Sequence, residues 1–347
     1  MKIGITGGSG FIGGHTIEAA IKRGHEVVVL DRRTQSIDPV YRPDPDEFPY
    51  QTLLGSVTDD VAVRELGAHV DGIIHLAACL GTQETIKYPI PAAETNLFGG
   101  LNFLETVAQY GIAGCYIGVG NHWMQNTYSI TKTMIERFVQ MYNNDRGTHV
   151  NIVRAMNAYG PRQSVAPPFG PAKVRKIMPS FVCRALTGHP IELYGGGTQV
   201  SDMVYVADVA DVLVRMLEQS AQKQVAPPVE VGPQSGPDVR GVADMVRAMA
   251  SAYTGLAPVE HVDLPMRPGE TVGDIVRADA KSLWPAGKTH QDLLPFVEGA
   301  EITVDWYFRN WLPKWKATQV AIAAPVAELS DPAKPWRPEL PIEEQFG

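Results

Sequence analysis

Short apolar runs alternate with longer amphipathic stretches over the first part of the chain, up to about residue 160. The runs are rich in Val and Ile and short enough for buried strands, which we expect at residues 2–6, 26–31, 72–77, 115–119 and 150–155. The stretches between them are long enough for helices, which we expect at residues 15–23, 91–110 and 128–142. Strands that alternate with helices predict an α/β fold, a doubly wound parallel sheet with helices on both faces.

The pattern changes after Gly160 and Pro161. Residues 163–176 are rich in proline, glycine and basic side chains and predict a loop. Beyond it, we expect helices at residues 178–186, 238–253 and 301–311 and returning strands at residues 202–206 and 229–232. The predicted organisation is a sheet domain (residues 1–165, with returning segments at about 202–232), a smaller lobe (residues 166–201 and 233–316) and an extended proline-rich arm (residues 317–347).

The charge of the chain narrows its possible partners. Of 347 residues, 38 are Asp or Glu and 30 are Lys or Arg, which gives a net charge of −8 with neutral histidine and disfavours nucleic acid or an anionic membrane as a partner. No stretch approaches the roughly 18 apolar residues of a membrane span, and no signal-peptide region precedes the first run, so we expect a cytoplasmic protein. Three widely spaced cysteines, Cys79, Cys115 and Cys183, predict neither disulfides nor a metal site and are expected to be buried thiols.

A glycine-rich segment, residues 6–13, follows the first strand and opens the first helix. Gly7 permits a tight turn, Gly10 lets the backbone approach a pyrophosphate, and Gly13 allows the helix to pack closely on the strand. The unpaired N–H groups at the start of the helix favour an anion. Together these features predict a dinucleotide-binding site.

The end of the second strand indicates which dinucleotide is bound. Asp31 stands where a carboxylate accepts hydrogen bonds from the adenosine ribose and repels a 2′-phosphate, which favours NAD over NADP. Arg32 and Arg33 follow directly, and a guanidinium there would instead accept a 2′-phosphate. We therefore expect NAD, with NADP as the alternative.

Tyr128 and Lys132 are spaced by one helical turn directly after the strand at residues 115–119. The carboxyl end of that strand is where a doubly wound sheet places a bound nicotinamide. A nearby ammonium and a positively charged nicotinamide both favour the phenolate and lower a phenol pKa from about 10. Tyr128 is therefore the predicted base, with Lys132 as its partner.

These motifs, with His75-Leu76-Ala77-Ala78 and Asn96, resemble the extended short-chain dehydrogenase/reductase family of nucleotide-sugar epimerases and dehydratases over about residues 1–312. The resemblance implies a Rossmann fold with a smaller C-terminal substrate-binding lobe, bound NAD, a nucleotide-diphosphate sugar as substrate, and a homodimer in which helices near residues 96–110 and 128–142 pair across a two-fold axis. The cofactor-binding residues that it implies are Gly7, Gly10, Phe11, Ile12, Gly13, Asp31, Arg32, Ser56, Val57, Leu76, Ala77, Ala78, Asn96, Tyr128 and Lys132. The substrate-binding residues that it implies are Thr82, Asn157, Lys176 and Arg267, with Arg267 on the diphosphate.

The chain departs from the family pattern at several positions. Gly120 stands where the family usually has a Ser or Thr that hydrogen-bonds the reacting hydroxyl. Asn121 and His122 fall where the 4,6-dehydratases carry an acid/base pair of Asp and Glu, so both are candidate catalytic residues. Ser56 replaces a usual Asp, and Ser201 replaces an Arg that often holds the diphosphate.

Three functions are compatible with these residues. The first is a nucleotide-sugar 4-epimerase, in which Tyr128 takes the proton of the 4-hydroxyl while hydride leaves carbon 4 for NAD and later returns to the other face. The second keeps the same oxidation but uses His122 to remove a carbon-bound proton, which gives a dehydratase or a 3,5- or 5-epimerase. The third, suggested by Gly120 and Ser201, is a dinucleotide-sensing or scaffold protein without turnover.

Overall fold

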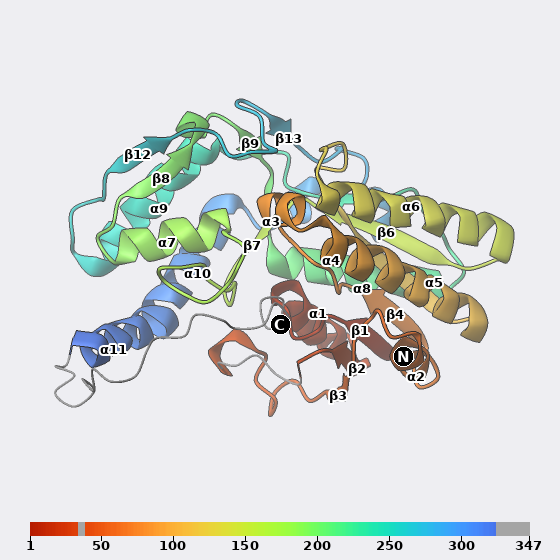
Figure 1. Cartoon of the computed structure of the whole chain (residues 1–347). Helices are drawn as coiled ribbons and strands as arrows, with labels where there is room; N and C mark the ends of the chain where they lie inside the picture. The colour runs from red at the N-terminus through yellow and green to blue at the C-terminus, as the bar shows by residue number, and fades with distance from the viewer. Residues whose placement is uncertain (34–38, 324–347) are drawn as a thin grey trace, which may run out of the picture.

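The computed structural model describes residues 1–33 and 39–323 of the chain (Figure 1). Its centre is a seven-stranded parallel sheet in the order β11-β6-β5-β4-β1-β2-β3. The order runs outward in both directions from β1, which confirms the predicted doubly wound sheet. The strands are β1 (Lys2–Thr6), β2 (Glu26–Asp31), β3 (Gln51–Leu54), β4 (Gly72–His75), β5 (Ala113–Val119), β6 (Val150–Ala155) and β11 (Val229–Val231).

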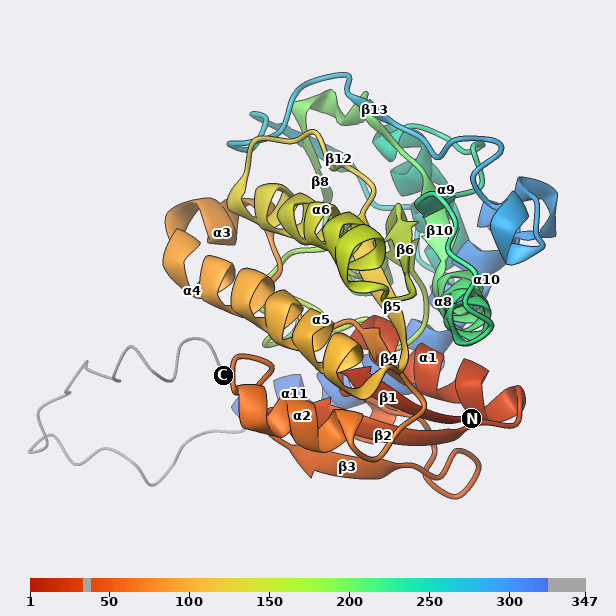
Figure 2. The ribbon, with the colours of Figure 1, turned by 90° about the vertical axis from the view of Figure 1, so that its right-hand side faces the viewer.

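Helices cover both faces of this sheet (Figures 1 and 2). In β2, Val27 and Val29 face one helical layer and Val28 and Leu30 face the other, because successive side chains of a strand point to opposite sides. The first layer holds α1 (Phe11–Lys22) and α8 (Val206–Ala221), and the second holds α2 (Asp60–Gly67), α5 (Gly99–Tyr110) and α6 (Thr127–Arg146).

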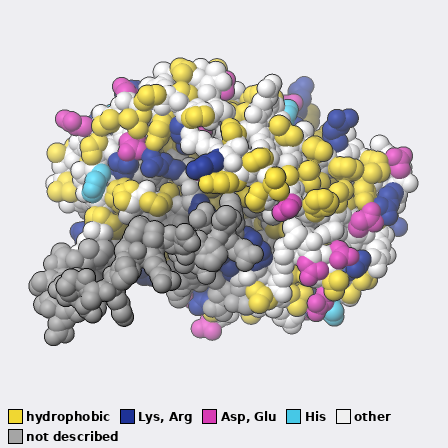
Figure 3. Space-filling view, in the orientation of Figure 1, with side chains coloured by type: hydrophobic (Ala, Val, Ile, Leu, Met, Phe, Trp, Pro, Cys, Tyr) yellow, Lys and Arg dark blue, Asp and Glu magenta, His cyan; other side chains and the backbone are white. Residues whose placement is uncertain are grey.

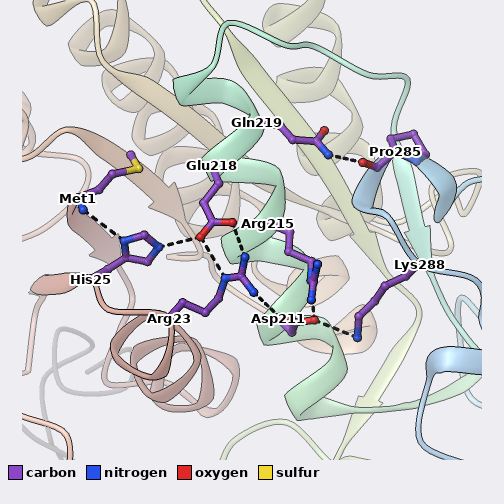
Figure 4. Close-up of polar contacts among 9 residues, drawn as sticks. All are labelled: Met1, Arg23, His25, Asp211, Arg215, Glu218, Gln219, Pro285 and Lys288. Atoms are coloured by element: carbon purple, nitrogen blue, oxygen red, sulfur yellow. Dashed lines mark hydrogen bonds and ion pairs between the residues drawn. The ribbon is translucent and has the colours of Figure 1, made fainter.

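A polar network fastens the first layer together (Figure 4). Glu218 on α8 accepts hydrogen bonds from Arg23, at the end of α1, and pairs with His25 at 2.8 Å. Two turns earlier on α8, Asp211 forms an ion pair of 2.9 Å with Lys288. The network joins α1, α8 and the segment around Lys288 (Figure 4), and α1 and α8 cover the face of the sheet opposite to α6.

The segment between β4 and α5 is helical, and the helix predicted over residues 91–110 is present with a π-helical turn inside it. It forms α3 (Thr82–Lys87), α4 (Pro89–Ala93) and a π-helical turn (Glu94–Phe98) before α5 begins. None of the described helices combines the length and the apolar character that a membrane crossing requires.

A smaller lobe follows, with its own hydrophobic core around Phe181, Val246 and Tyr307. Two small parallel pairs, β7 with β10 and β9 with β13, accompany a third pair, β8 with β12. Short 3-10 turns lie at Pro39–Tyr41, Gly195–Gly197, Trp284–Ala286 and His290–Asp292. The remaining elements are β7 (Asn157–Tyr159), α7 (Ile177–Leu186), β8 (Ile191–Tyr194), β9 (Val200–Ser201), β10 (Met203–Tyr205), α9 (Val239–Thr254), β12 (His261–Leu264), β13 (Ile275–Val276), α10 (Phe296–Trp306), a π-helical turn (Tyr307–Trp311) and α11 (Leu312–Ala323).

Two predictions for this half of the chain are wrong. The strand expected at residues 202–206 does not return to the large sheet, because β11 occupies the edge of β6 and β10 pairs with β7 instead. The arm expected from residue 317 begins as a helix, because α11 continues through residues 317–323, which contain neither proline nor glycine. Residues 324–347 of the predicted arm lie outside the described residues.

Candidate active site

The glycine-rich segment forms a turn that no larger side chain fits. Gly7 has a φ of +73°, and a Cβ there would lie 2.8 Å from the backbone nitrogen of Ala77. A Cβ at Gly13 would lie 2.4 Å from the carbonyl oxygen of Gly7. Gly10 is the N-cap of α1 and offers no side-chain cap to Phe11, Ile12 and the following N–H groups. This cradle at a helix N-terminus fits a pyrophosphate.

Asp31 organises the same turn from the end of β2. Its carboxylate accepts the N–H of Ser9 at 3.0 Å and the N–H of Arg33 at 3.2 Å. Ser56 and Val57 follow β3, the neighbouring strand, and reach the same edge of the sheet. The residues predicted to hold adenosine thus come together, with Arg32 next to Asp31 in the chain.

The segment after β4, which contains Leu76, Ala77 and Ala78, is held from both sides. Thr6 Oγ1 accepts the N–H groups of Leu76 and Ala77 at 3.2 and 3.3 Å. Asn96, which is 2% exposed, binds the backbone of Cys79 with both ends of its amide, at 2.8 and 3.2 Å. Asn96 therefore fixes the backbone of the segment that follows β4.

Tyr128 lies in the first turn of α6, and its N–H donates to Thr85 Oγ1 of α3 at 3.2 Å. Burial raises the pKa of the Tyr128 phenol to about 12. Lys132 is 1% exposed, and its Nζ lies 4.1 Å from the centre of the Tyr116 ring. Burial lowers the pKa of Lys132 to about 7, and the charge of Glu136 opposes that shift.

The expectation that Lys132 lowers the phenol pKa is not met in this arrangement. Burial dominates at Tyr128, and the Lys132 ammonium faces the ring of Tyr116. A phenolate at Tyr128 therefore requires further positive charge close to it.

The turn between β5 and α6 carries the other candidate catalytic residues. The Asn121 amide donates to Met124 Sδ at 2.8 Å, within the turn itself. The carbonyl of His122 accepts the Thr133 hydroxyl at 3.3 Å, and its ring stands edge-on to Trp123. Among the described residues, no hydrogen bond or ring contact joins Asn121 or His122 to the Tyr128 and Lys132 pair.

Gly120 packs against Met156, the residue that follows β6. A Cβ at Gly120 would lie 2.5 Å from Met156 Sδ and 3.0 Å from Met156 Cα. The hydroxyl side chain usual in the resembled family therefore has no room here.

Three of the four predicted substrate residues, Thr82, Lys176 and Arg267, lie near one another. A Cβ at Gly269 would lie 3.3 Å from Thr82 Cγ2, so the loop that carries Arg267 packs on the start of α3. Burial lowers the pKa of Lys176, the N-cap of α7, and the charge of Arg267 contributes to that shift. Asn157, at the start of β7, has no hydrogen bond to this group among the described residues.

The guanidinium of Arg267 is already paired. It forms an ion pair of 2.7 Å with Glu270 and lies 5.0 Å from the centre of the Tyr194 ring. Sequence reasoning missed Glu270 and also Glu136. The signal was spacing, since Glu270 stands three residues after Arg267, and Glu136 stands one helical turn after Lys132.

The cysteines and acidic side chains give no sign of a metal centre in the described ranges, 1–33 and 39–323, where no group of three potential ligands is placed to hold an ion. Cys115 and Cys183 are buried as expected, whereas Cys79 is half-buried beside Asn96.

Comparison with known proteins identifies relatives of this arrangement. Residues 3–232 match the model of a family described as the NAD dependent epimerase/dehydratase family. A UDP-N-acetyl-alpha-D-glucosaminuronate decarboxylase of Bacillus cytotoxicus is 26% identical over 275 residues, which cover 74% of this chain and 82% of the relative. A dTDP-glucose 4,6-dehydratase of Mycobacterium tuberculosis is 26% identical over 352 residues, which cover 92% and 98%.

The chain is also similar to a solved structure. The UDP-glucose 4-epimerase of Thermus thermophilus, in complex with NAD, superposes with a TM-score of 0.72 at 28% identity and covers 89% of this chain and 99% of its own. The relatives are named for different reactions, which include epimerisation, dehydration and decarboxylation.

Proposed function

The chain belongs to the NAD dependent epimerase/dehydratase family, and from this premise we propose that it is a nucleotide-sugar 4-epimerase. The observation that carries the proposal is the placement of Tyr128 and Lys132 one turn apart on one face of α6, while the Asn121 amide is bound within its own turn. Tyr128 would accept the proton and Lys132 would supply positive charge when NAD oxidises a hydroxyl-bearing carbon. Asn121, an amide, supplies no acid or base for a proton on carbon.

NAD is the cofactor of the family, and this chain offers a cradle for it. Gly7, Gly10 and Gly13 would admit the pyrophosphate, and Asp31 would accept hydrogen bonds from the adenosine ribose. Bound NAD would supply a hydride acceptor and donor for carbon 4 of the sugar.

The protein residues manage the proton and the charge. Tyr128 Oη takes the proton of the 4-hydroxyl as the carbonyl forms at carbon 4, and it returns the proton when the carbonyl is reduced on its other face. Lys132, one helical turn from Tyr128 on the same face of α6, contributes positive charge on that side of the site. Bound NAD would supply, through its nicotinamide, the further positive charge that a phenolate at Tyr128 requires.

The substrate diphosphate is assigned to Arg267 and Lys176, with Thr82 and Asn157 as further contacts. Phosphate oxygens would compete with Glu270 for the Arg267 guanidinium, so substrate binding exchanges one ion pair for another. A diphosphate held in this way leaves the sugar free to turn and present its other face to Tyr128. The Thermus thermophilus relative, which is named for UDP-glucose, makes this sugar nucleotide the first to test.

A homodimer through α4, α5 and α6 is part of the same proposal. Large apolar side chains are exposed along these helices, and Figure 3 shows hydrophobic side chains gathered on that side of the molecule. They include Ile90 at 69%, Phe98 at 59%, Ile130 at 50% and Met134 at 41% exposure. Such a patch is typical of an interface. A monomer in sedimentation at micromolar concentration would exclude the dimer.

Two variants test the proposed reaction. Tyr128→Phe should fold and bind NAD but lose at least about a hundredfold in turnover, because only the proton acceptor is removed. His122→Ala should turn over within a few fold of the unmodified protein. If His122→Ala still reduces NAD to NADH but forms no product, His122 is an acid/base at carbon, and the chain is a dehydratase or a proton-transfer epimerase. Normal turnover by Tyr128→Phe would overturn both reactions.

A further inference from the structure

A line of alternating charges leads from Lys132 into the sheet. Glu136 lies one helical turn beyond Lys132 on α6, Arg154 lies on β6, and Glu230 lies on β11. Arg154 holds Glu136 through three hydrogen bonds of 2.6, 3.1 and 3.2 Å. Arg154 and Glu230 are register partners, with an ion pair of 3.1 Å. The charges therefore alternate in sign from the catalytic pair to the edge of the sheet.

The carboxylate of Glu136 has little freedom to move. Glu136 is 3% exposed, and a Cβ at Gly118 would lie 2.2 Å from its Oε1. Gly118 is also the register partner of Arg154 on the neighbouring strand. The sheet therefore places the guanidinium, and the missing side chain at Gly118 leaves the space that the carboxylate fills.

Lys132 is surrounded by groups from three elements. Tyr128 and Glu136 lie one turn to either side of it on α6, Tyr116 lies under it on β5, and His75 lies on β4. Burial lowers the pKa of His75 to about 3 and raises that of Tyr116 well above its usual range, so both are neutral at pH 7. Among these groups, Glu136 supplies the negative charge.

We propose that Glu136 is a positioning residue for Lys132. The Glu136 carboxylate stabilises the Lys132 ammonium from the side opposite to Tyr128. Because Arg154 binds this carboxylate, Glu136 does not form a direct ion pair with Lys132. The ammonium is then available to Tyr128 and to the cofactor. Because Gly120 offers no hydroxyl to the phenol, activation of Tyr128 depends more strongly on this charge. The catalytic consequence rests on the proposed function, but the electrostatic arrangement does not.

Substitutions of Glu136 and of its partner Arg154 should shift the Lys132 pKa in opposite directions. Glu136→Gln removes the negative charge, so the Lys132 pKa should fall from about 7 by about one pH unit or more. Arg154→Gln frees the carboxylate to pair with the ammonium, so the Lys132 pKa should rise by a similar amount. Both variants should lose turnover, the first because the charge is lost and the second because the ammonium is captured.

The experiment is a pH titration of the full chain labelled with ε-13C lysine, followed by NMR, with the Lys132 signal assigned from Lys132→Arg. Glu136→Asp keeps the charge and should return the titration toward that of the unmodified protein. Glu218→Gln, which alters a carboxylate bound by Arg23 on the other face of the sheet, is the matched control and should leave the titration unchanged. Circular dichroism establishes that each variant is folded.

A merely structural ion pair would leave the Lys132 titration unmoved, and that result, or shifts in the same direction in both variants, overturns the proposal. If Glu136→Gln does not fold, Arg154→Gln decides alone, since an unchanged or lowered pKa there contradicts capture of the ammonium. The titration is made without substrate. Suppose that the Lys132 pKa falls in Glu136→Gln and rises in Arg154→Gln, but the unmodified protein epimerises no nucleotide sugar. That result would refute the proposed function and leave this inference standing.

Discussion

Gly118→Ala should destabilise the protein far more than the loss of one glycine usually does. The added Cβ would meet Glu136 Oε1 at 2.2 Å and Arg154 Cγ at 3.0 Å. The first distance is more than 1 Å short of an ordinary contact, on the order of 3.5 Å. The carboxylate must retreat by roughly that amount, and its hydrogen bonds to Arg154 cannot survive the movement intact.

The cost has two parts. Overpacking of a well-filled interior costs about 1–3 kcal/mol, and breaking a buried ion pair outright costs about 3–5 kcal/mol. Because Arg154 keeps Glu230 as a partner, we expect only part of the second cost, and a total loss of about 2–4 kcal/mol in the free energy of unfolding.

Equilibrium unfolding in urea, followed by tryptophan fluorescence and far-ultraviolet circular dichroism, measures this loss. Gly14→Ala is the matched control. Gly14 lies within α1, and a Cβ there would lie at an ordinary contact distance of 3.4 Å from Pro43 Cδ. Alanine is also more favourable than glycine inside a helix by up to about 1 kcal/mol. A Gly118→Ala protein within about 0.5 kcal/mol of the unmodified one would refute the argument that the sheet leaves space only for the carboxylate.

Three further changes probe other parts of the molecule. Asp31→Ala should weaken NAD binding and narrow the preference over NADP in calorimetric titration; tighter NADP binding by the unmodified protein would show that Asp31 does not select the cofactor. Gly120→Ser should lower the free energy of unfolding, measured in urea, by about 1–3 kcal/mol, because Met156 fills the space beside Gly120. The double variant Gly120→Ser, Met156→Ala should recover part of this loss. A Gly120→Ser protein as stable as the unmodified one would contradict the steric reasoning. Burial lowers the pKa of His15 and His75 to about 3, so between pH 6.5 and 3 these two side chains bind protons in the unfolded chain only. The free energy of unfolding should therefore fall with decreasing pH by about 1.4 kcal/mol per pH unit for each histidine. His15→Gln should remove one of these two contributions to the pH dependence, and an unchanged pH dependence would argue against a buried, neutral His15.

Much of the large sheet is predictable from local pattern. The five strands predicted in the first 160 residues are Val- and Ile-rich runs, and each lies in the sheet. The returning strand predicted at residues 229–232 also lies there, as β11. β3 was missed because Gln51–Leu54 is short and half-exposed. α8 was missed because Val206 follows Tyr205 of β10 directly, without a glycine or proline to mark the change.

The candidate site divides in the same way. The glycine turn and the spacing of Tyr128 and Lys132 are local, so the sequence displays them. The contacts of Glu136 with Arg154 and of Arg154 with Glu230 depend on strand register, which joins residues far apart in the chain. Register and the packing of the second lobe are set by tertiary structure, and the sequence pattern does not reveal them.

The fate of the hydrogen on carbon 4 tests the proposed epimerisation most directly. The unmodified protein is given a panel of UDP- and dTDP-sugars, beginning with UDP-glucose, each deuterated at carbon 4. The products are examined by NMR and mass spectrometry. We predict that the label stays on carbon 4 as that carbon is inverted, and that unlabelled substrate in D2O takes up no deuterium. Loss of the label, uptake of deuterium at carbon 3 or 5, or a product lighter by water or carbon dioxide would contradict 4-epimerisation.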